Sequence, residues 1–488
     1  MTITLVFLLL YGLCMLGITI YSVFQFLLSI RWISNRKDFL QRETPAVKDW
    51  PDVLIQIPLY NEKYVAARII RACANLNYEI GKMHIQILDD STDETTSIVA
   101  AEVSELKSKE FRISHVRRDN REGFKAGALA HGMTLSNEPL IAIFDADFIP
   151  PSDFLKNTIP WLQNDNSVGV VQTRWGHLNE KSSLLTRVQA LALDNHFTVE
   201  QGGRNAAGHF INFNGTAGVW RRDTITDAGG WESDTLTEDL DLSYRAQLRG
   251  WKFLYLPHVV VPAELPPDMN ALKSQQYRWT KGAAECARKN LKRVISSKAL
   301  GPSHSIHAIV HLLNSGVFLC IGGAAIFSIP LLFLMPASDE LRPAFIISGG
   351  LFISTALFAF VYILSQLGKG KQMFTLFYLY PAFLVMSLGL FLHNAIAVIQ
   401  GYAGVRTPFI RTPKYAGENE QSSAFRRMTY ATRKAAPTAW LEGLTGLVFL
   451  SCAAWGAGHE EYAFLVFHLM LGTGLLSTMF LSIVHTAR

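Results

Sequence analysis

Cysteine and charge are both scarce in this sequence. Its five cysteines are spread over 488 residues with no C-x-x-C pair, and three of them lie in or beside apolar runs. A thiol in such a setting behaves as a small hydrophobic side chain, so the pattern suggests neither a disulfide framework nor a zinc site. Only 17% of the residues are charged, and the net charge is +5. A nucleic-acid binder would gather its basic residues more densely, so we expect no nucleic-acid partner.

Apolar residues, by contrast, are abundant. They make up 49% of the chain, and the mean hydropathy is +0.18. Both values are high for a soluble protein and low for a pure membrane bundle, and the length allows a domain of about 250 residues plus substantial further structure. We therefore predict a soluble domain joined to a set of membrane spans, which makes the lipid bilayer a partner.

The first long apolar segment, Ile3 to Ile30, carries no charge and is long enough to cross a bilayer. A secretory signal would begin with basic residues and end at a small-residue cleavage site. Here the basic residues Arg31, Arg36 and Lys37 follow the apolar segment instead. We predict a retained transmembrane anchor over residues 1–36, with the next domain in the cytosol.

The second half of the chain contains five more apolar stretches, near 310–336, 344–366, 373–404, 439–457 and 462–485. The 405–437 loop is strongly basic, so it and the GKGKQ loop should both face the cytosol. Both loops can face the cytosol only if the segment 373–404 does not cross the bilayer. That stretch contains Pro381, His393 and Asn394, which suit an interfacial or re-entrant helix. We predict a multi-pass protein with five spans and one interfacial helix.

Between about 50 and 265, short apolar runs alternate with amphipathic stretches. The runs rich in Ile and Val are 52–57, 84–88, 112–116, 140–144 and 168–172. This alternation predicts an α/β domain around a mostly parallel sheet, in which ligands bind at the carboxyl ends of the strands. The segments that follow the first four runs are polar, namely PLYNE, DDSTDE, RRDNREGFKAGAL and DADF. The sequence thus predicts a binding site at one edge of the sheet.

Asp145 and Asp147 end the fourth predicted strand. Two carboxylates one residue apart can hold Mg²⁺ or Mn²⁺ against a diphosphate, although a turn with two solvated acids is the alternative. Asp90 is suited to accept hydrogen bonds from a base or ribose, with helix capping as the alternative. Lys125 lies at a predicted helix start, where a nearby phosphate would explain a cation.

Two further groups precede the second set of membrane segments. Glu238 and Asp239 open a predicted helix behind Thr237, in the N-cap position. Acids in a first turn stabilise a helix, but one at the mouth of a site could deprotonate an acceptor hydroxyl. The QQYRW box spans Gln275 to Trp279 on the next helix. Its arginine suits bidentate phosphate contact and its tryptophan the face of a sugar ring, whereas an interfacial aromatic belt and lipid headgroups are the alternatives.

Taken in order, these motifs resemble the family 2 inverting glycosyltransferases, in the cellulose-synthase-like processive branch. QIPLYNE, LDDSTDET, REGFKAGAL, FDADF, LDNHFTVEQ, FNGTAGVWR, AGGW, TED and YRW look most similar to the mannan and glucomannan synthases of the cellulose-synthase-like A type. The resemblance covers about 37–300 and extends more loosely over the membrane region. TPFIRTPKYAG, from 407 to 417, is similar to the family's gating loop, although Arg411 and Pro413 depart from the usual pattern.

The resemblance implies a GT-A fold that binds a nucleotide-sugar donor on the cytosolic side, with a divalent cation, Mn²⁺ or Mg²⁺. The residues it assigns to the donor are Tyr60, Glu62, Asp90, Lys125, Asp145, Gln275 and Arg278. Asp145 and Asp147 are assigned to the metal. Asp239 is implied as the general base, with Glu238 beside it as the second catalytic acid.

For the glycan acceptor, the resemblance implies that Trp279 stacks under the sugar at the entrance to a transmembrane channel, with Asn214 and Gly215 as the floor. Phe197, Trp175 and Trp220 are candidates for lining the route, and core packing is the alternative for each. The polar motifs then lie next to the membrane because the growing glycan leaves through it.

These implications define four regions: the anchor at 1–36, a cytosolic GT-A catalytic domain at 37–266, interface helices with the QxxRW box at 267–303, and a transmembrane region at 304–488 with the gating-like loop 405–437. The expected activity is transfer of hexose from GDP-mannose or UDP-glucose to a growing β-glycan, in a bacterial plasma membrane or in the Golgi. One alternative is a glycosyltransferase that makes a glycolipid. The other is a transporter or receptor that only binds nucleotide.

Overall fold

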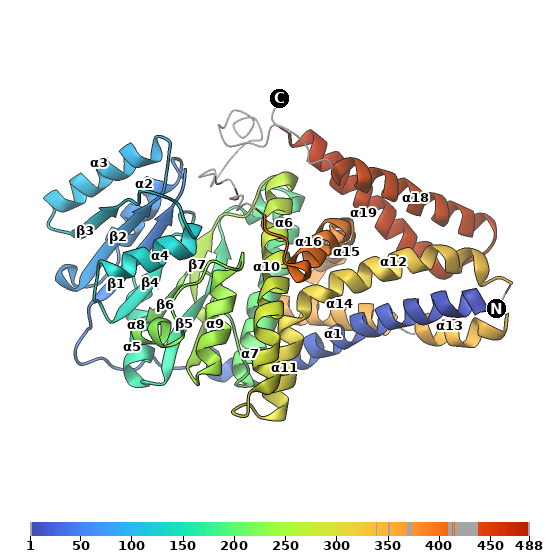
Figure 1. Ribbon diagram of the computed structural model, residues 1–488, viewed down its shortest axis with the longest axis horizontal. Coiled ribbons are helices and arrows are strands. Elements are labelled where there is room, and N and C mark those ends of the chain that lie inside the picture. The colour runs from blue at the N-terminus through green and yellow to red at the C-terminus, as the bar shows by residue number, and fades with distance from the viewer. Residues whose placement is uncertain are drawn as a thin grey trace.

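The computed structural model describes residues 2–337, 339–349, 352–367, 373–407, 412, 414 and 438–486. An α/β domain lies at one end of the molecule and a group of long helices at the other, with helix α10 standing between them (Figure 1). The carboxyl-end edge of the sheet is therefore close to the helical region.

The α/β domain is built on one seven-stranded sheet in the order β3-β2-β1-β4-β6-β5-β7. The strands are β1 (Val53–Leu59), β2 (Met83–Asp89), β3 (Arg112–Val116), β4 (Leu140–Ile143), β5 (Val168–His177), β6 (Gly218–Arg221) and β7 (Lys252–Ala263). Only β6 runs antiparallel to its neighbours within this sheet. The carboxyl ends of the other six strands consequently share one edge.

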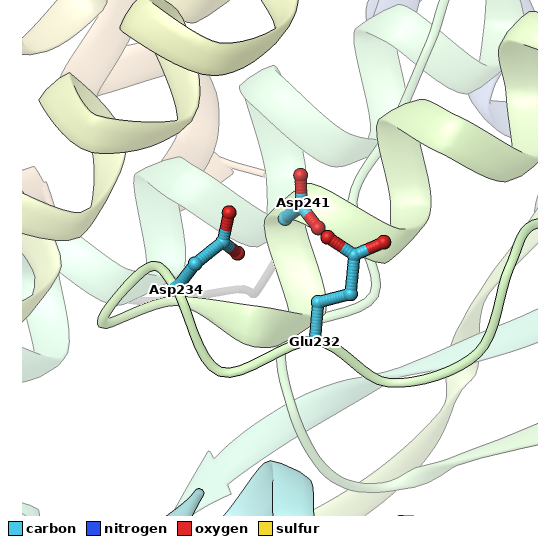
Figure 2. A group of neighbouring side chains, drawn as sticks. All are labelled: Glu232, Asp234 and Asp241. Carbon is cyan, nitrogen blue, oxygen red and sulfur yellow. The ribbon is translucent and has the colours of Figure 1, made fainter.

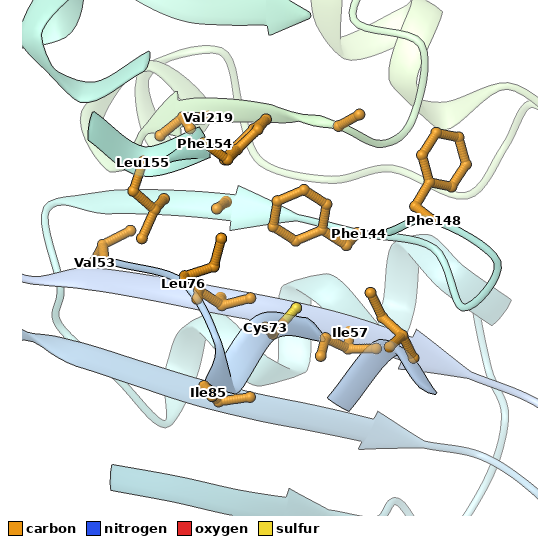
Figure 3. Packing of buried hydrophobic residues seen from close by; sticks show 14 of the residues in the cluster. Val53, Ile57, Cys73, Leu76, Ile85, Phe144, Phe148, Phe154, Leu155 and Val219 are labelled. Atoms are coloured by element: carbon orange, nitrogen blue, oxygen red, sulfur yellow. The ribbon is translucent and has the colours of Figure 1, made fainter. Parts of the chain in front are cut away.

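The five predicted strands are confirmed as β1 to β5, and the mostly parallel α/β sheet is the one expected. Their continuous Ile and Val runs reflect burial on both faces, as in other parallel sheets. One core cluster on one face of the sheet contains Val53, Ile57, Phe144 and Phe154 (Figure 3). Residues of alternate register, such as Ile141, belong to a second core on the other face. The strands β6 and β7 were not predicted.

Helices cover both faces of the sheet. Those of the α/β domain are α2 (Ala66–Ala74), α3 (Thr95–Ser108), α4 (Phe124–Thr134), α5 (Phe154–Asn164), α8 (Arg222–Asp227) and α9 (Glu238–Leu248). Helices at the junction with the helical region are α6 (Leu184–Asn195), a π-helix (His196–Gln201), α7 (Gly202–Ala206), α10 (Met269–Ser296) and α11 (Pro302–Leu312). Asp268 caps α10 by accepting from the backbone N–H of Ala271 at 2.8 Å.

The remaining helices are mostly apolar. They are α1 (Thr2–Leu40), α12 (Val317–Leu334), α13 (Arg342–Gly349), α14 (Phe352–Leu367), α15 (Met373–Gly389), α16 (Phe391–Ala403), α18 (Thr438–Gly458) and α19 (Leu465–Val484). Helix α1 packs on α12 and α14, and α18 packs on α19. Helix α1 is far from α12 and α14 in the sequence, yet it lies beside them in Figure 1.

Four helical segments among the described residues are long and apolar enough to cross a bilayer: Thr2–Leu40, Asn314–Leu334, Thr438–Gly458 and Tyr462–Val484. They correspond to four of the five predicted spans. The fifth, 344–366, falls on α13 and α14, which are both shorter than a span. The predicted interfacial segment 373–404 is a pair of helices, α15 and α16, bent by 49°. If that pair counts as one span the number rises to five, so the span count stays a prediction.

Candidate active site

A cavity of about 210 Å³ opens at the carboxyl-end edge of the sheet, against α9 and α10. Every residue that the sequence predicted for the site lines this cavity: Tyr60, Glu62, Asp90, Lys125, Asp145, Asp147, Asn214, Gly215, Glu238, Asp239, Gln275, Arg278 and Trp279. They come from the loops after β1, β2 and β4, from the loop before β6, from the starts of α4 and α9, and from the interior of α10. The fold thus gathers them at one place, and their individual roles remain predictions.

Lys125 joins two of the predicted motifs at the floor of the cavity. Its Nζ donates to Asp145 Oδ1 at 2.6 Å and to the backbone carbonyl of Gly215 at 2.8 Å. Burial disfavours the charged ammonium, but Asp145 and Glu238 together raise the pKa of Lys125 above its ordinary value. Burial also opposes ionisation of Asp145, yet the charge of Lys125 holds its pKa low. The pair is therefore ionised.

Asp239 and Glu238 begin helix α9 and face the same space. Burial, and then the neighbouring Glu238, raise the pKa of Asp239 to about 7. Burial likewise raises the pKa of Glu238, although Lys125 opposes the shift. A carboxyl group that titrates near neutral pH is suited to take a proton from a hydroxyl and release it again. Gly215 borders Asp239 closely, since a Cβ there would lie 2.9 Å from Asp239 Oδ2.

The start of α9 is fixed from the side away from the cavity. Thr237 is the N-cap residue, but its hydroxyl makes no capping hydrogen bond. Instead, the third acid of the motif, Asp241, is completely buried and binds three neighbours. It accepts from Arg245 Nε at 2.8 Å, from Asn290 Nδ2 at 2.9 Å and from Lys289 Nζ at 3.0 Å. Because Lys289 and Asn290 belong to α10, these bonds hold α9 and α10 together.

Glu232, Asp234 and Asp241 point toward one another in Figure 2, as metal ligands would. The ammonium of Lys289 occupies that position, at 2.6 Å from Glu232 and Asp234 as well as 3.0 Å from Asp241. The group is therefore an ion-pair cluster that fastens the loop before α9 onto α10.

Two arginines that the sequence did not single out contact residues at the far end of the cavity, and one of them, Arg121, also lines it. Arg118 pairs with both carboxylate oxygens of Asp90, at 3.0 and 2.5 Å. The guanidinium of Arg121 lies 3.3 Å from the ring centre of Tyr60, as a cation–π pair. Both arginines belong to the polar run RRDNREGFK, in which the sequence assigns an individual role only to Lys125.

Two residues of the gating-like loop also enter the cavity. Lys414 forms an ion pair with Asp147 at 2.5 Å and lies 3.9 Å from Glu62, and Thr412 accepts from Arg278 at 2.7 Å. The other residues of 408–437 lie outside the described part of the chain. Burial raises the pKa of Asp147, and the positive charge of Lys414 opposes this rise. Nothing in the local sequence pattern placed Lys414 beside Asp147.

The QQYRW box lies on α10, where Gln275, Arg278 and Trp279 all face the cavity. Burial lowers the pKa of Arg278 despite the nearby carboxylates. The ring of Trp279 lies 6.4 Å from that of Trp175 at the end of β5, with a tilt of 53°. These two rings form an aromatic wall on the side of the cavity that faces the helical region.

A second cavity, of about 410 Å³, continues from this wall into the helical region. The two cavities share Trp175, Leu193, Asn214, Thr237, Asp239, Gln275 and Trp279. Farther in, the second cavity is lined by residues of α12, α14 and α15, including Phe318, Tyr362 and Phe383. Of the aromatic residues suggested for a route, Trp175 and Phe197 line it. Trp220 lines neither cavity and packs in the core on one face of the sheet.

Comparison with known proteins agrees with this architecture. Residues 51–282 match the family model described as "Glycosyltransferase like family 2". The matched segment begins just before β1 and ends within α10, so it contains the whole sheet and the QQYRW box. Together with the sheet topology, the match identifies the α/β domain as a GT-A fold.

The chain is also similar to several plant proteins. It is 45% identical over 274 residues to a probable glucomannan 4-beta-mannosyltransferase 4 of Oryza sativa subsp. japonica, which covers 55% of this chain and 49% of that protein. It is 44% identical over 264 residues to glucomannan 4-beta-mannosyltransferase 9 of Arabidopsis thaliana, covering 53% and 50%. The chain thus spans about half the length of the curated relatives it matches.

A mannosyltransferase of Pyrobaculum calidifontis, solved with GDP-Man and Mn²⁺, is 17% identical with a TM-score of 0.49, over 73% of this chain and 100% of that one. That likeness is too loose to bear on substrate.

Proposed function

We propose that this chain, whose residues 51–282 are a glycosyltransferase-like family 2 domain, is an inverting polysaccharide synthase of a membrane. It would transfer mannose, or glucose, from a nucleotide-diphospho-sugar to the non-reducing end of a β-1,4-mannan or glucomannan. The names of the similar plant proteins support a mannosyl donor. GDP-mannose is therefore the first donor to test, and UDP-glucose the second.

The observation that carries this proposal is the continuity of the two cavities. Asp239 and Trp279 line both of them, so the group suited to act as base lies where the first cavity meets the second. A donor bound over Asp145 would meet an acceptor at this junction. The product could then move away from the donor, into the helical region, without leaving the protein. A glycosyltransferase with a soluble acceptor needs no such continuation.

The residues suit a single displacement at the anomeric carbon. The acceptor hydroxyl gives its proton to a carboxylate oxygen of Asp239, while its oxygen attacks C1 of the donor sugar. The bond from C1 to the diphosphate oxygen breaks on the opposite face, and the nucleoside diphosphate leaves with the electron pair. Configuration at C1 is inverted. Arg278 and Gln275 would hold the diphosphate, and Lys125 would offset its charge.

At the other end of the donor, Tyr60, Asp90 and Glu62 are proposed to bind the nucleoside. The cation–π pair of Tyr60 with Arg121 offers a flat surface for a base. On the acceptor side, Trp279 would stack against the terminal sugar, and Asn214 with Gly215 would lie beneath it. All these residues border one cavity, which is the support for treating them as one site.

The residues also fit a hard divalent cation. The cavity is lined by seven Asp or Glu residues and only four Arg or Lys residues, so a diphosphate needs added positive charge there. Two ammonium groups already pair with Asp145 and Asp147, at 2.6 and 2.5 Å. We propose that these two aspartates hold Mg²⁺ or Mn²⁺. Such an ion would share diphosphate oxygens and neutralise the charge of the leaving group.

The four long apolar helices support a membrane location. We propose that the catalytic domain faces the cytosol, where nucleotide sugars are made, in a bacterial plasma membrane or in the Golgi. A glycosyltransferase that completes a glycolipid is the alternative product class, but the continuation of the second cavity into the helical region favours a polymer.

The test is a product assay on protein purified in detergent with Mn²⁺ or Mg²⁺. GDP-mannose and UDP-glucose are supplied separately, and the product is digested with β-mannanase, β-1,4-glucanase or β-1,3-glucanase. We expect a polymer from GDP-mannose that β-mannanase cleaves. A product cleaved only by a glucanase would reassign the donor, and a single-sugar lipid extracted into organic solvent would overturn polymer synthesis.

A further inference from the structure

The turn of α10 that follows the QQYRW box has no role in the mechanism above, yet it contacts two loops that border the active-site cavity. One loop precedes α9 and contains Leu236, which lines the cavity. The other begins at Val405, after α16, and leads into the gating-like loop, whose Thr412 lines the same cavity. Two charged residues of the turn, Lys281 and Glu285, are buried, and each of them bonds to one of these loops.

Glu285 holds the loop before α9. Its Oε2 accepts from the backbone N–H of Leu236 at 2.8 Å. Leu236 lies in neither a helix nor a strand, so its N–H needs an acceptor from outside regular secondary structure. Asp239, the proposed base, follows three positions later. The carboxylate of Glu285 therefore fixes the backbone just ahead of the base.

The start of α9 also lies in direct contact with this turn of α10. A Cβ on Gly282 would lie 2.5 Å from Cγ2 and 2.6 Å from Oγ1 of Thr237, the N-cap residue of α9. In addition, Cys286 Sγ lies 3.4 Å from Thr237 Oγ1. A close-packed contact of this kind transmits a shift of one segment to the other. A shift of the turn thus reaches the helix that carries Asp239.

Lys281 holds the second loop. Its side chain is completely buried, and its Nζ donates to the backbone carbonyl of Val405 and to Thr407 Oγ1, both at 2.6 Å. Helix α16, which ends just before this loop, lies beside α10 (Figure 1). The two helices approach so closely that a Cβ on Gly401 would lie 2.7 Å from the carbonyl oxygen of Lys281. The segment 405–407 is therefore fixed to the same turn of α10.

The two charged side chains also face each other. Lys281 Nζ lies 3.7 Å from Glu285 Oε1, one helical turn away. Replacing a buried ion pair by apolar side chains of similar size often leaves a protein equally or more stable, so stability alone does not explain this pair. Charged groups do form directed hydrogen bonds, here to one loop on each side. A series of contacts thus runs from Val405 through Lys281 and Glu285 to Leu236.

We propose that Lys281 and Glu285 are positioning residues for sugar transfer, which set the loop ahead of Asp239 relative to the segment 405–407. The proposal rests on the proposed function and deepens it. Neither side chain lines either cavity, so each acts through the loop that it binds. Loss of the Glu285 contact displaces the base without removing a group that binds the donor.

The experiment measures initial rates of mannose incorporation into polymer by the whole chain in detergent, with Mn²⁺ and a range of GDP-mannose concentrations. Glu285→Leu removes the acceptor of the Leu236 N–H. We expect its kcat to fall about 100-fold while the KM for GDP-mannose changes by less than about threefold, because misplacement of a reacting group slows the chemical step. Glu285→Gln keeps an oxygen at the same place, so it should restore most of the wild-type rate.

Glu102→Leu is the matched control for a general loss of stability. Glu102 is also a buried carboxylate, it pairs with Arg71 at 2.5 Å between α3 and α2, and it lines neither cavity. Melting temperatures are recorded for every variant, and rates are measured well below the lowest of them. Under these conditions Glu102→Leu should keep the wild-type kcat.

Lys281→Met tests the other half of the link, and it keeps the proposal testable even if Glu285→Leu folds poorly. It releases Val405 and Thr407, and we expect kcat to fall about tenfold. Because both side chains act through one series of contacts, the double variant should be slower than Glu285→Leu by less than about threefold.

Four results would overturn the proposal while the proposed function stands. They are a higher KM without a loss of kcat in Glu285→Leu, no recovery in Glu285→Gln, an equal loss of kcat in Glu102→Leu, and an unchanged kcat in Lys281→Met. Losses that multiply in the double variant would likewise overturn the link between the two loops. Absence of transfer by the wild type would instead overturn the proposed function.

Discussion

Gly215 and Asp239 are packed so closely that a single added carbon atom would separate them. A Cβ on Gly215 would lie 2.9 Å from Asp239 Oδ2 and 3.3 Å from Lys125 Nζ, and the residue has φ of +79°. Glycine is thus required twice, for its left-handed backbone and for its missing side chain. The FNGT loop consequently sets the position of the carboxylate proposed as the base.

Replacing Gly215 by alanine should therefore damage both stability and turnover. The left-handed backbone costs about 1–3 kcal/mol for a residue with a side chain. In addition, the Cβ pushes Asp239 away from the acceptor, so we expect transfer to fall by about 100-fold or more. Gly230→Ala is the matched control, because Gly230 has nearly the same φ, +78°, and open space around a Cβ. It should lose stability only. Equal activity losses in the two variants would refute a special role for the Gly215 contact.

Transfer should depend on pH through the carboxyl group of Asp239. Its pKa is raised from an ordinary 3.8 to about 7, and only the ionised form accepts a proton. The rate at saturating donor should therefore rise about tenfold per pH unit below pH 7 and level off above it. Rates measured in a constant-ionic-strength buffer series, with donor binding followed in parallel, test this. A rate that is flat between pH 5 and pH 8 would contradict Asp239 as the base.

The raised pKa of Asp239 makes the free energy of unfolding fall as pH rises, whereas it makes the transfer rate increase. The folded protein keeps the Asp239 proton up to about pH 7, whereas the unfolded chain releases it near 3.8. This group therefore stabilises the fold at low pH, and that contribution is lost as pH rises through 7. Asp239→Asn, which cannot ionise, should raise the melting temperature relative to wild type at pH 8 more than at pH 5. A difference that is independent of pH would mean that the folded-state pKa is close to ordinary.

A buried ion pair links the QQYRW helix to the helical region. Lys273 on α10 donates to both carboxylate oxygens of Glu442 on α18, at 2.7 and 2.9 Å, and both side chains are almost completely buried. Removing one partner leaves an uncompensated buried charge, which costs about 3–5 kcal/mol. We expect Lys273→Met or Glu442→Leu alone to lower the melting temperature sharply in detergent. The double variant should recover most of the loss, whereas additive losses would show that the pair does not interact.

Lys414 and a divalent cation should compete for Asp147. The ammonium lies 2.5 Å from the carboxylate, so a metal ion can bind there only after the lysine moves. Without donor, Lys414→Met should bind Mn²⁺ more tightly than wild type by about tenfold, as measured by electron paramagnetic resonance titration. Lys63→Met, which removes a pair with the exposed Glu94 outside the cavity, is the control. Weaker Mn²⁺ binding in the Lys414 variant would mean that the lysine supports the metal site.

The sheet and the site differ in how far sequence predicts them. The runs that became β1 to β5 were predictable because strands buried on both faces need continuous apolar residues. The strand β6 has only four residues inside the FNGTAGVWR motif, and β7 is interrupted by Pro257 and His258, so neither shows a clear period. The site residues were found because their motifs end strands at one edge of a parallel sheet.

The partners of those residues were not predictable, since they come from elsewhere in the chain. The pairing of Arg118 with Asp90 depends on the register of β2 against β3, and that of Lys414 with Asp147 on a loop far along the sequence. Nor could the pattern of the LDNHFTVEQ segment reveal a π-helix.

The most direct test of the account is to measure donor binding and sugar transfer in the same Asp239→Asn preparation. Asparagine keeps the shape of the side chain but cannot take a proton. We predict that GDP-mannose binds with nearly wild-type affinity while polymer formation is abolished. Asp223→Asn, at an exposed carboxylate on α8, should behave like wild type. Retained transfer in the Asp239 variant, or loss of donor binding with it, would contradict the assignment of Asp239 as the base.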